Sequence, residues 1–288
     1  MSTVTLPAGE ARARFGDLVA AEWIKLRSLR STYAVLAAGA LVSIGICANS
    51  ARSNVHLIAT SARPDDQRAA LDPLHAAFVP EAYQILMLVA ASVGASVIFG
   101  EYSSGMIRTT FAAVPARRPV VAAKVLVVAA MMLAYGTAVA AGTFGLTQAI
   151  YDQEGIGLPI GAPGAFRAVA GAALIAVVAG MVGMALGALV RHPAGTVGAA
   201  VGVLVLLPRL FEGDTYRWVA ETGNAMPYAA WAALVENPVR NMMPEGRDAP
   251  MRPVDPYPVS ITEAWLVYGA WALVAVAVAV AAVHRRDV

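Results

Sequence analysis

Residues 168–190 read AVAGAALIAVVAGMVGMALGALV, an apolar stretch that contains no charged side chain. About 20 apolar residues in a helix span the hydrocarbon core of a bilayer, because each residue advances the helix by about 1.5 Å. An unpaired backbone amide in lipid costs several kcal/mol, so such a stretch has to be helical. We therefore expect this segment to cross a membrane as an α-helix.

Five more segments meet the same length and composition rule. They are expected at about Ser31–Asn49, Ala82–Gly100, Val120–Tyr151, Ala194–Leu207 and Ala264–Val283, of which Ala194–Leu207 is the shortest. Of the 288 residues, 58% are hydrophobic and 14% are charged, whereas about a quarter of a soluble domain is charged. The sequence therefore predicts an all-α, polytopic membrane protein with six transmembrane helices.

The connections divide the chain into three expected parts. These are a cytoplasmic N-terminus (1–30), a six-helix transmembrane domain (31–283) and a cytoplasmic tail (284–288). Outer loops are expected at about 50–81, 152–165 and 208–262, and a cytoplasmic connection at 101–118. Residues 1–30 have basic side chains but no apolar core, so a cleavable signal peptide is not expected.

The basic residues predict the orientation, because cytoplasmic segments of membrane proteins carry an excess of Lys and Arg. With the N-terminus inside, the inner segments hold 12 of the 21 Lys and Arg residues and the outer segments hold nine. Acidic residues divide the other way, with five inside and 14 outside. We expect a multi-pass protein of the cell (plasma) membrane with both termini in the cytoplasm. The excess of Arg over Lys, with abundant Ala, Val and Gly, is typical of a GC-rich bacterial genome.

Some local features predict helix packing. Gly183 with Gly187, and Gly198 with Gly202, have the spacing that lets two helices approach closely. The apolar stretch Met226–Val235 is too short to span the bilayer. We expect it to be either a re-entrant or interfacial helix, or a helix packed within the outer loop.

The sequence lacks the residues that several classes of nucleotide, metal and catalytic site require. A P-loop requires Gly directly before its Lys, and neither Lys25 nor Lys124 follows a Gly. Cys47 is the single cysteine, which excludes Cys-based zinc sites. His192 precedes Pro193 at a helix junction and is expected to be a helix-terminus residue rather than a metal ligand. No cofactor, metal or catalytic residue is therefore expected in this chain.

Transport driven by the chain alone is also disfavoured. The middles of the six expected spans carry no ionisable side chain, whereas ion-coupled transporters usually do. The spans contain no catalytic pair that would indicate a membrane enzyme. The net charge of +2 does not indicate nucleic-acid binding.

The segment 14–30, RFGDLVAAEWIKLRSLR, has the pattern of an amphipathic helix. Its apolar residues fall within about 140° of a helical circumference, flanked by Lys25 and Arg27. Together with Trp23, this predicts a helix lying on the inner leaflet before the first span. Glu22 lies within the apolar arc, so we expect its carboxylate to have a protein partner. A simple juxtamembrane anchor is the alternative.

The connection 100–124, GEYSSGMIRTTFAAVPARRPVVAAK, places Glu101 at the cytoplasmic end of the second span. A short helix is expected at Ser103–Ala113, with a hydroxyl cap at its start and Pro115 after its end. A short helix held between two spans would move both spans when it is displaced. The alternative is an ordinary positive-inside loop, which would require only Arg117 and Arg118.

This connection resembles the cytoplasmic loop of ABC-2 type transporter permeases. That family typically shows an acidic residue, then Gly-Thr and a basic residue, then Pro, Arg and a Lys that begins the third helix. The matching residues here are Glu101, Gly105, Arg108, Pro115, Arg117 or Arg118, and Lys124, and Met106 stands in the place of the Thr. The segment AEWIKLRS, which contains Glu22, Lys25 and Arg27, resembles the N-terminal elbow helix of the family. The six-span layout is also similar.

The resemblance implies the membrane subunit of an ATP-driven exporter that works by alternating access. ATP and Mg²⁺ would bind a separate ATP-binding subunit, this chain would not be an enzyme, and a second copy or a homologous permease would complete a dimer in the bilayer. Coupling to the ATPase is expected at Glu101, Tyr102, Gly105, Arg108, Pro115, Arg117, Arg118 and Lys124, and the elbow helix would contribute Glu22, Trp23, Lys25 and Arg27.

Scattered polar side chains in the spans favour an apolar or amphipathic substrate. The alternative function is a non-transporting membrane scaffold, immunity component or sensor. A membrane enzyme ranks third, since it would need a catalytic pair that the sequence does not offer.

Overall fold

The computed structural model describes residues 14–103, 105, 117–213, 216–236 and 257–285. All regular secondary structure in these residues is helical, and six helices are long and apolar enough to cross a membrane. They are α2 (Arg30–Thr60), α4 (Pro80–Ser103), α6 (Arg117–Tyr151), α7 (Ala165–Val190), the continuous segment α8–η3–α9 (Pro193–Leu210) and α12 (Ile261–Arg285). This confirms the predicted all-α polytopic fold.

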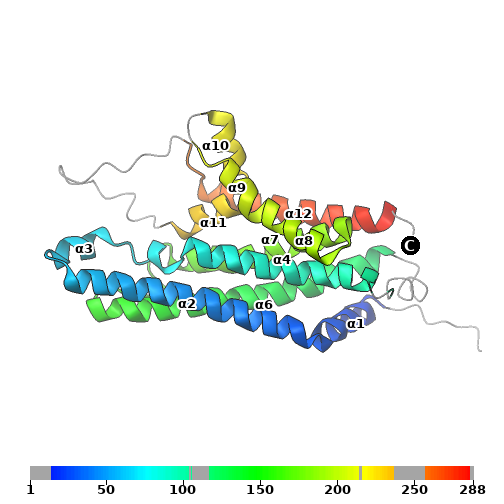
Figure 1. Cartoon of the computed structure of the whole chain (residues 1–288), viewed down its shortest axis with the longest axis horizontal. Coiled ribbons are helices and arrows are strands. Elements are labelled where there is room, and N and C mark those ends of the chain that lie inside the picture. Colours follow the sequence, from blue (N-terminus) through cyan, green and yellow to red (C-terminus); the bar gives the residue numbers. More distant parts are fainter. Residues whose placement is uncertain (1–13, 104, 106–116, 214–215, 237–256, 286–288) are drawn as a thin grey trace, which may run out of the picture.

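The remaining elements precede or connect the spans. They are α1 (Phe15–Ser28), α3 (Pro64–Ala70), η1 (His75–Ala77), η2 (Asp152–Glu154), α10 (Arg217–Asn224) and α11 (Pro227–Val235). In Figure 1, α2, α4 and α6 run side by side along the long axis, and α12 lies on the other side of α7. Helix α1 and the C-terminal end of α12 lie at the same end of the bundle. This end is called the α1 end below.

Helix α7 is the centre of the bundle, and small residues explain how it packs there. It contacts α4, α6, α11 and α12, and most of its residues are buried. A Cβ added to Gly183 would overlap the backbone carbonyl of Ala91 in α4, and one added to Gly187 would lie 2.7 Å from the carbonyl oxygen of Ala95. The backbones of α4 and α7 therefore touch, as predicted for the pair Gly183 and Gly187.

The second glycine pair behaves differently. Within the described part of the chain, a Cβ added to Gly198 or Gly202 would have no atom within 4 Å. This pair therefore mediates no helix contact there, contrary to the prediction. His192 lies at a helix terminus as expected: it is the N-cap of α8, and its Nδ1 accepts a hydrogen bond from the backbone N–H of Gly195.

The first outer connection contains more helix than predicted. The expected span ended at Asn49 and an outer loop was expected at 50–81, but α2 continues to Thr60. Residues 50–60 contain no Gly or Pro that would stop a helix, and Ala51 and Ile58 bury one face of the extension. Asn54 on the same extension donates a hydrogen bond to the hydroxyl of Tyr151, at 3.0 Å. Helix α3 then occupies part of the rest of the connection.

The apolar stretch 226–235 forms α11, which packs against α7 and α12. Trp231 is 2% exposed and stacks on Tyr83 of α4, with ring centroids 5.0 Å apart. Arg167 at the start of α7 donates hydrogen bonds to the carbonyls of Leu234 and Glu236. These contacts show that α11 packs against three of the spans, and the choice between the two predicted alternatives stays open because both allow such packing. Of the short helix expected at Ser103–Ala113, α4 includes Ser103, and residues 104 and 106–113 lie outside the described residues.

We expect Gly183→Ala to destabilise the protein by roughly 1–3 kcal/mol, because the added methyl group forces α4 and α7 apart. Gly198→Ala is the matched control, since the same change occurs in a helix that has open space at that position. There, the higher helix propensity of Ala gives no loss or a gain of up to about 1 kcal/mol. Thermal unfolding of the two detergent-solubilised variants checks this. Equal midpoints for both variants would contradict the close contact.

Candidate functional site

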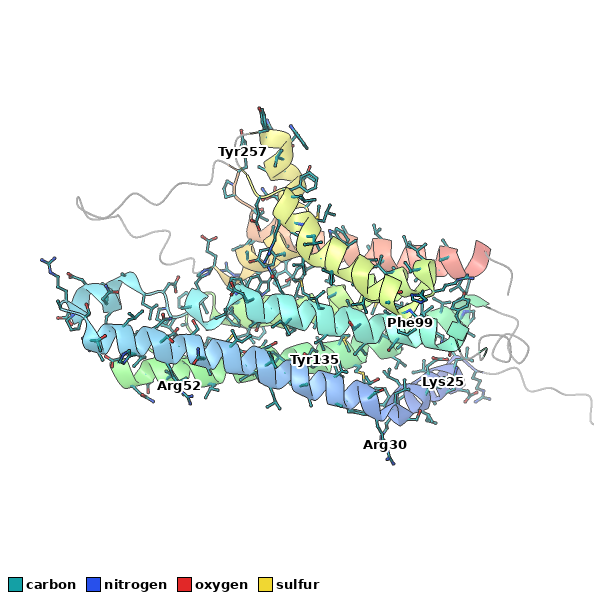
Figure 2. All side chains as sticks on the ribbon, in the orientation of Figure 1. Lys25, Arg30, Arg52, Phe99, Tyr135 and Tyr257 are labelled. Carbon is teal, nitrogen blue, oxygen red and sulfur yellow. The ribbon has the colours of Figure 1, made fainter. Side chains whose placement is uncertain are left out.

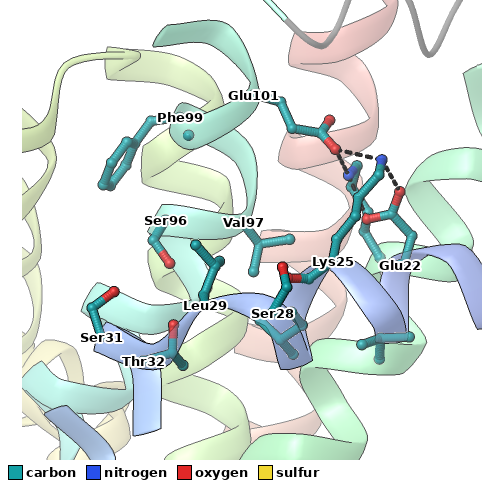
Figure 3. Close-up of a pocket in the computed structure, with 14 residues that line it drawn as sticks. Glu22, Lys25, Ser28, Leu29, Ser31, Thr32, Ser96, Val97, Phe99 and Glu101 are labelled. Carbon is teal, nitrogen blue, oxygen red and sulfur yellow. Dashed lines mark hydrogen bonds and ion pairs between the residues drawn. The ribbon is translucent and has the colours of Figure 1, made fainter. Parts of the chain in front are cut away.

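Four charged side chains from three helices meet at the α1 end of the bundle. Helix α1 packs against the start of α6, and its Glu22 and Lys25 face Lys124 of α6 and Glu101 in the last turn of α4. Figure 2 locates Lys25 at this end, and Figure 3 shows the group in close-up. The two segments that carry the sequence resemblance thus come together in one site.

The four groups form a closed ring of ion pairs. The ammonium of Lys124 lies 2.6 Å from Oε2 of Glu22 and 2.6 Å from Oε1 of Glu101. The ammonium of Lys25 lies 2.8 Å from Oε1 of Glu22 and 2.8 Å from the same Oε1 of Glu101. Each carboxylate therefore accepts from both ammoniums, and the ring is electrically neutral. We call these residues the ion-pair ring.

Three members of the ion-pair ring are buried. The side chains of Glu22 and Lys124 are each 6% exposed and that of Glu101 is 7% exposed, whereas Lys25 is 34% exposed. Burial of a charge is costly unless an opposite charge and hydrogen bonds compensate it. Removing one member therefore leaves an uncompensated buried charge, while the intact ring holds α1 in a defined position against α4 and α6.

The sequence of α1 explains why Glu22 faces inward. Glu22 and Leu26 are one helical turn apart and are the two buried residues of α1. Leu26 joins the main hydrophobic core, and Glu22 reaches Lys124 from the same face. The protein partner expected for the Glu22 carboxylate is therefore in the same chain. Trp23 and Arg27 are exposed, as a helix lying at a membrane surface requires.

The pKa of Lys25 reflects these contacts. Burial by itself lowers the pKa, but the hydrogen bonds to Glu101 and Glu22 outweigh it, so the pKa of Lys25 is raised above its ordinary value. Lys25 therefore remains an ammonium throughout the physiological range.

Tyr102 and Arg191 form a second contact beside the ring, which the sequence did not predict. The Arg191 guanidinium lies 4.1 Å from the centroid of the Tyr102 ring, within the range of a cation–π interaction. Arg191 caps α7 with a φ of 56°, and this left-handed turn directs the chain back toward α4. Tyr102 and Arg191 are 89 positions apart in the sequence, so no local sequence pattern could predict their contact.

The other predicted coupling residues are placed only in part. Gly105 has a φ of 71°, a left-handed conformation that suits glycine, and Arg118 is exposed near the start of α6. Arg117 begins α6. Arg108 and Pro115 lie outside the described residues. Their predicted contact with an ATPase stays a prediction.

A cavity of about 450 Å³ opens beside the ion-pair ring, between α1, α2, α4 and α6. Figure 3 shows Ser31, Thr32 and Ser96 among the side chains that line it, with Leu29 and Val97. In the described residues, no group of three or more His, Cys, Asp and Glu side chains has the arrangement of a metal site. The site therefore offers ion pairs and hydroxyl groups to a partner or ligand.

Comparison with known proteins does not assign the chain to a family. No protein-family model matches the chain, and no curated protein matches it significantly.

We expect Lys124→Met to lower the free energy of unfolding by about 3–5 kcal/mol, because it leaves two buried carboxylates with one ammonium. The double variant Lys124→Met/Glu22→Gln should lose less than the single variant, since one carboxylate and Lys25 then remain as a balanced pair. Unfolding in mixed detergent micelles measures both values.

Arg217→Met is the control for this experiment. Arg217 forms an exposed ion pair with Glu221 in α10, which protrudes from the bundle away from the α1 end, and its removal should cause no measurable change. A Lys124→Met variant as stable as the wild type, or a double variant less stable than the single one, would show that the ring is not a compensated buried charge network.

The raised pKa of Lys25 predicts the pH range over which Lys25 stabilises the folded protein. A group whose pKa is higher in the folded state stabilises the fold fully below its ordinary pKa of 10.5 and loses that effect as the pH rises through the folded value. The stability difference between the wild type and Lys25→Gln should therefore be constant between neutral pH and about pH 9, and it should shrink above 10.5. A difference that disappears at or below about pH 9 would argue against these ion pairs.

Proposed function

We propose that this chain is the membrane-spanning permease subunit of an ATP-driven ABC-2 type exporter. A separate ATP-binding subunit supplies the energy, a second permease completes the transport path, and both termini lie in the cytoplasm. The cargo is apolar or amphipathic. The α1 end of the bundle is then the cytoplasmic end, where the ATPase docks.

The observation that carries this proposal is the ion-pair ring. Glu22 and Lys25 come from the segment that resembles an elbow helix, and Glu101 and Lys124 come from the two ends of the segment that resembles the coupling loop. Their convergence is the arrangement a force-transmitting junction needs. The spans α4 and α6 flank residues 104–116, so a partner that displaces this segment moves both spans, and the ring transmits the movement to α1.

The bundle supports this role by its rigidity. The backbones of α4 and α7 touch at glycines, and α6 contacts α7 in the same way through Gly136 and the carbonyl of Ala173. A force applied where α4 ends and α6 begins is therefore distributed over three packed spans rather than lost in a loop. Close-packed interiors transmit such displacements.

We expect the affinity-tagged protein, purified from detergent-solubilised membranes of its native host, to retain a soluble ATP-binding protein. Arg108→Ala should reduce the amount retained, because Arg108 belongs to the predicted docking segment. Arg217→Ala is the control, since it removes the same type of side chain from α10, away from the α1 end of the bundle. Quantitative mass spectrometry of the retained proteins measures the ratio.

Two results would contradict the proposal. If a monodisperse preparation retains no ATP-binding protein, the chain is a membrane scaffold, immunity component or sensor rather than an exporter subunit. If both variants lose the ATPase equally, the docking surface is not the segment between α4 and α6.

A further inference from the structure

The cavity beside the ion-pair ring has free hydrogen-bond donors. A Lys ammonium has three N–H donors, and Lys25 and Lys124 each use two of them in the ring. Each ammonium therefore keeps one donor. In the described part of the chain, the hydroxyls of Ser31 and Thr32 also have no hydrogen-bond partner, although Thr32 is only 6% exposed. These groups favour a ligand that has several acceptor oxygens.

Apolar side chains complete the lining. In Figure 3 the charged groups gather on one side, the hydroxyls of Ser31, Thr32 and Ser96 lie on the other, and Leu29 and Val97 lie between them. A small inorganic anion would leave this apolar surface without a partner. A molecule that joins a polar head to a hydrocarbon chain would use both kinds of surface.

The cavity lies at the depth of lipid headgroups. It is formed where α2 begins and α4 ends. The 24 residues of α4 are about 36 Å long, whereas the hydrocarbon core of a bilayer is about 30 Å thick. The last turns of α4 therefore reach the headgroup region of one leaflet. Arg27 and Arg30 do not line the cavity, but both are exposed at this end of the bundle and add positive charge at the same membrane surface, which favours an anionic head.

We infer that this cavity is a binding site for an anionic amphiphile of the adjoining leaflet. Its phosphate or carboxylate oxygens accept hydrogen bonds from Lys25 and Lys124, and the first part of its chain lies on Leu29 and Val97. An oxygen farther along the molecule, such as the ester carbonyl of a phospholipid, accepts a hydrogen bond from Thr32 on the opposite side. The volume of about 450 Å³ is typical of a small-molecule site and holds the head with the first chain carbons. The rest of the chain extends into the bilayer. This inference does not depend on the proposed exporter function.

Native mass spectrometry of the full-length protein in a neutral detergent tests the inference. Phosphatidylglycerol, oleate and phosphatidylcholine are added separately, and the bound fraction is measured against concentration. We expect an anionic amphiphile to bind about tenfold more tightly than phosphatidylcholine, because the choline cation of that zwitterionic lipid cancels the charge of its phosphate and is repelled by the ammoniums that face the cavity. Tight binding of phosphatidylglycerol alone identifies a phospholipid head, and equal binding of oleate shows that any anionic head suffices.

Two variants locate the site. Ser96→Leu places a larger side chain in the cavity and should reduce binding at least tenfold. Ser92→Leu is the matched control, because Ser92 is one turn earlier on α4, is also partly buried and does not line the cavity. Thr32→Val keeps the shape but removes the hydroxyl, and it should weaken binding about fivefold.

Three results would overturn the inference. One is equal affinity for phosphatidylglycerol and phosphatidylcholine in the wild type. Another is wild-type affinity in a monodisperse Ser96→Leu variant. If Ser96→Leu does not fold, wild-type affinity in Thr32→Val has the same consequence.

Discussion

Three buried charges at the α1 end of the bundle require one another. Glu22, Glu101 and Lys124 are almost fully removed from solvent, and each would destabilise the fold if the others were absent. Since they belong to three different helices, their mutual compensation defines where α1 lies relative to α4 and α6. Such a network adds little net stability compared with apolar packing, but it specifies one arrangement of the helices. That specificity is what the proposed junction with an ATP-binding subunit needs.

The two ends of the bundle are held by different chemistry. The α1 end uses buried ion pairs, whereas the opposite end uses aromatic stacking of Trp231 on Tyr83, backbone carbonyls that accept hydrogen bonds from Arg167, and a more exposed ion pair of Arg68 with Glu154. Between them, α7 packs through glycine and alanine, which allows backbone contact with α4. The middle of the bundle is therefore rigid, and the polar ends are where ligands and partners have groups to contact.

Hydropathy was sufficient to predict the six spans, because a bilayer demands long apolar helices whatever their neighbours are. It missed the extension of α2 to Thr60, since that part is stabilised by one buried face, including Ile58, rather than by overall hydrophobicity. All four members of the ion-pair ring were selected from the sequence, and the position of Glu22 in an apolar arc indicated a partner. The identity of that partner, Lys124, and the stacking of Arg191 on Tyr102 depend on tertiary packing that no local pattern encodes.

The central claim is that the ion-pair ring joins α1 rigidly to the transmembrane bundle. Spin labels at Arg27→Cys and Arg118→Cys, both exposed positions, in a Cys47→Ala background measure the distance between α1 and α6 in lipid nanodiscs. The account predicts one narrow distance distribution for this protein, and a broadened or split distribution when Lys124→Met is added. Equal widths with and without Lys124→Met would contradict it, because α1 would then be held by something other than the ring.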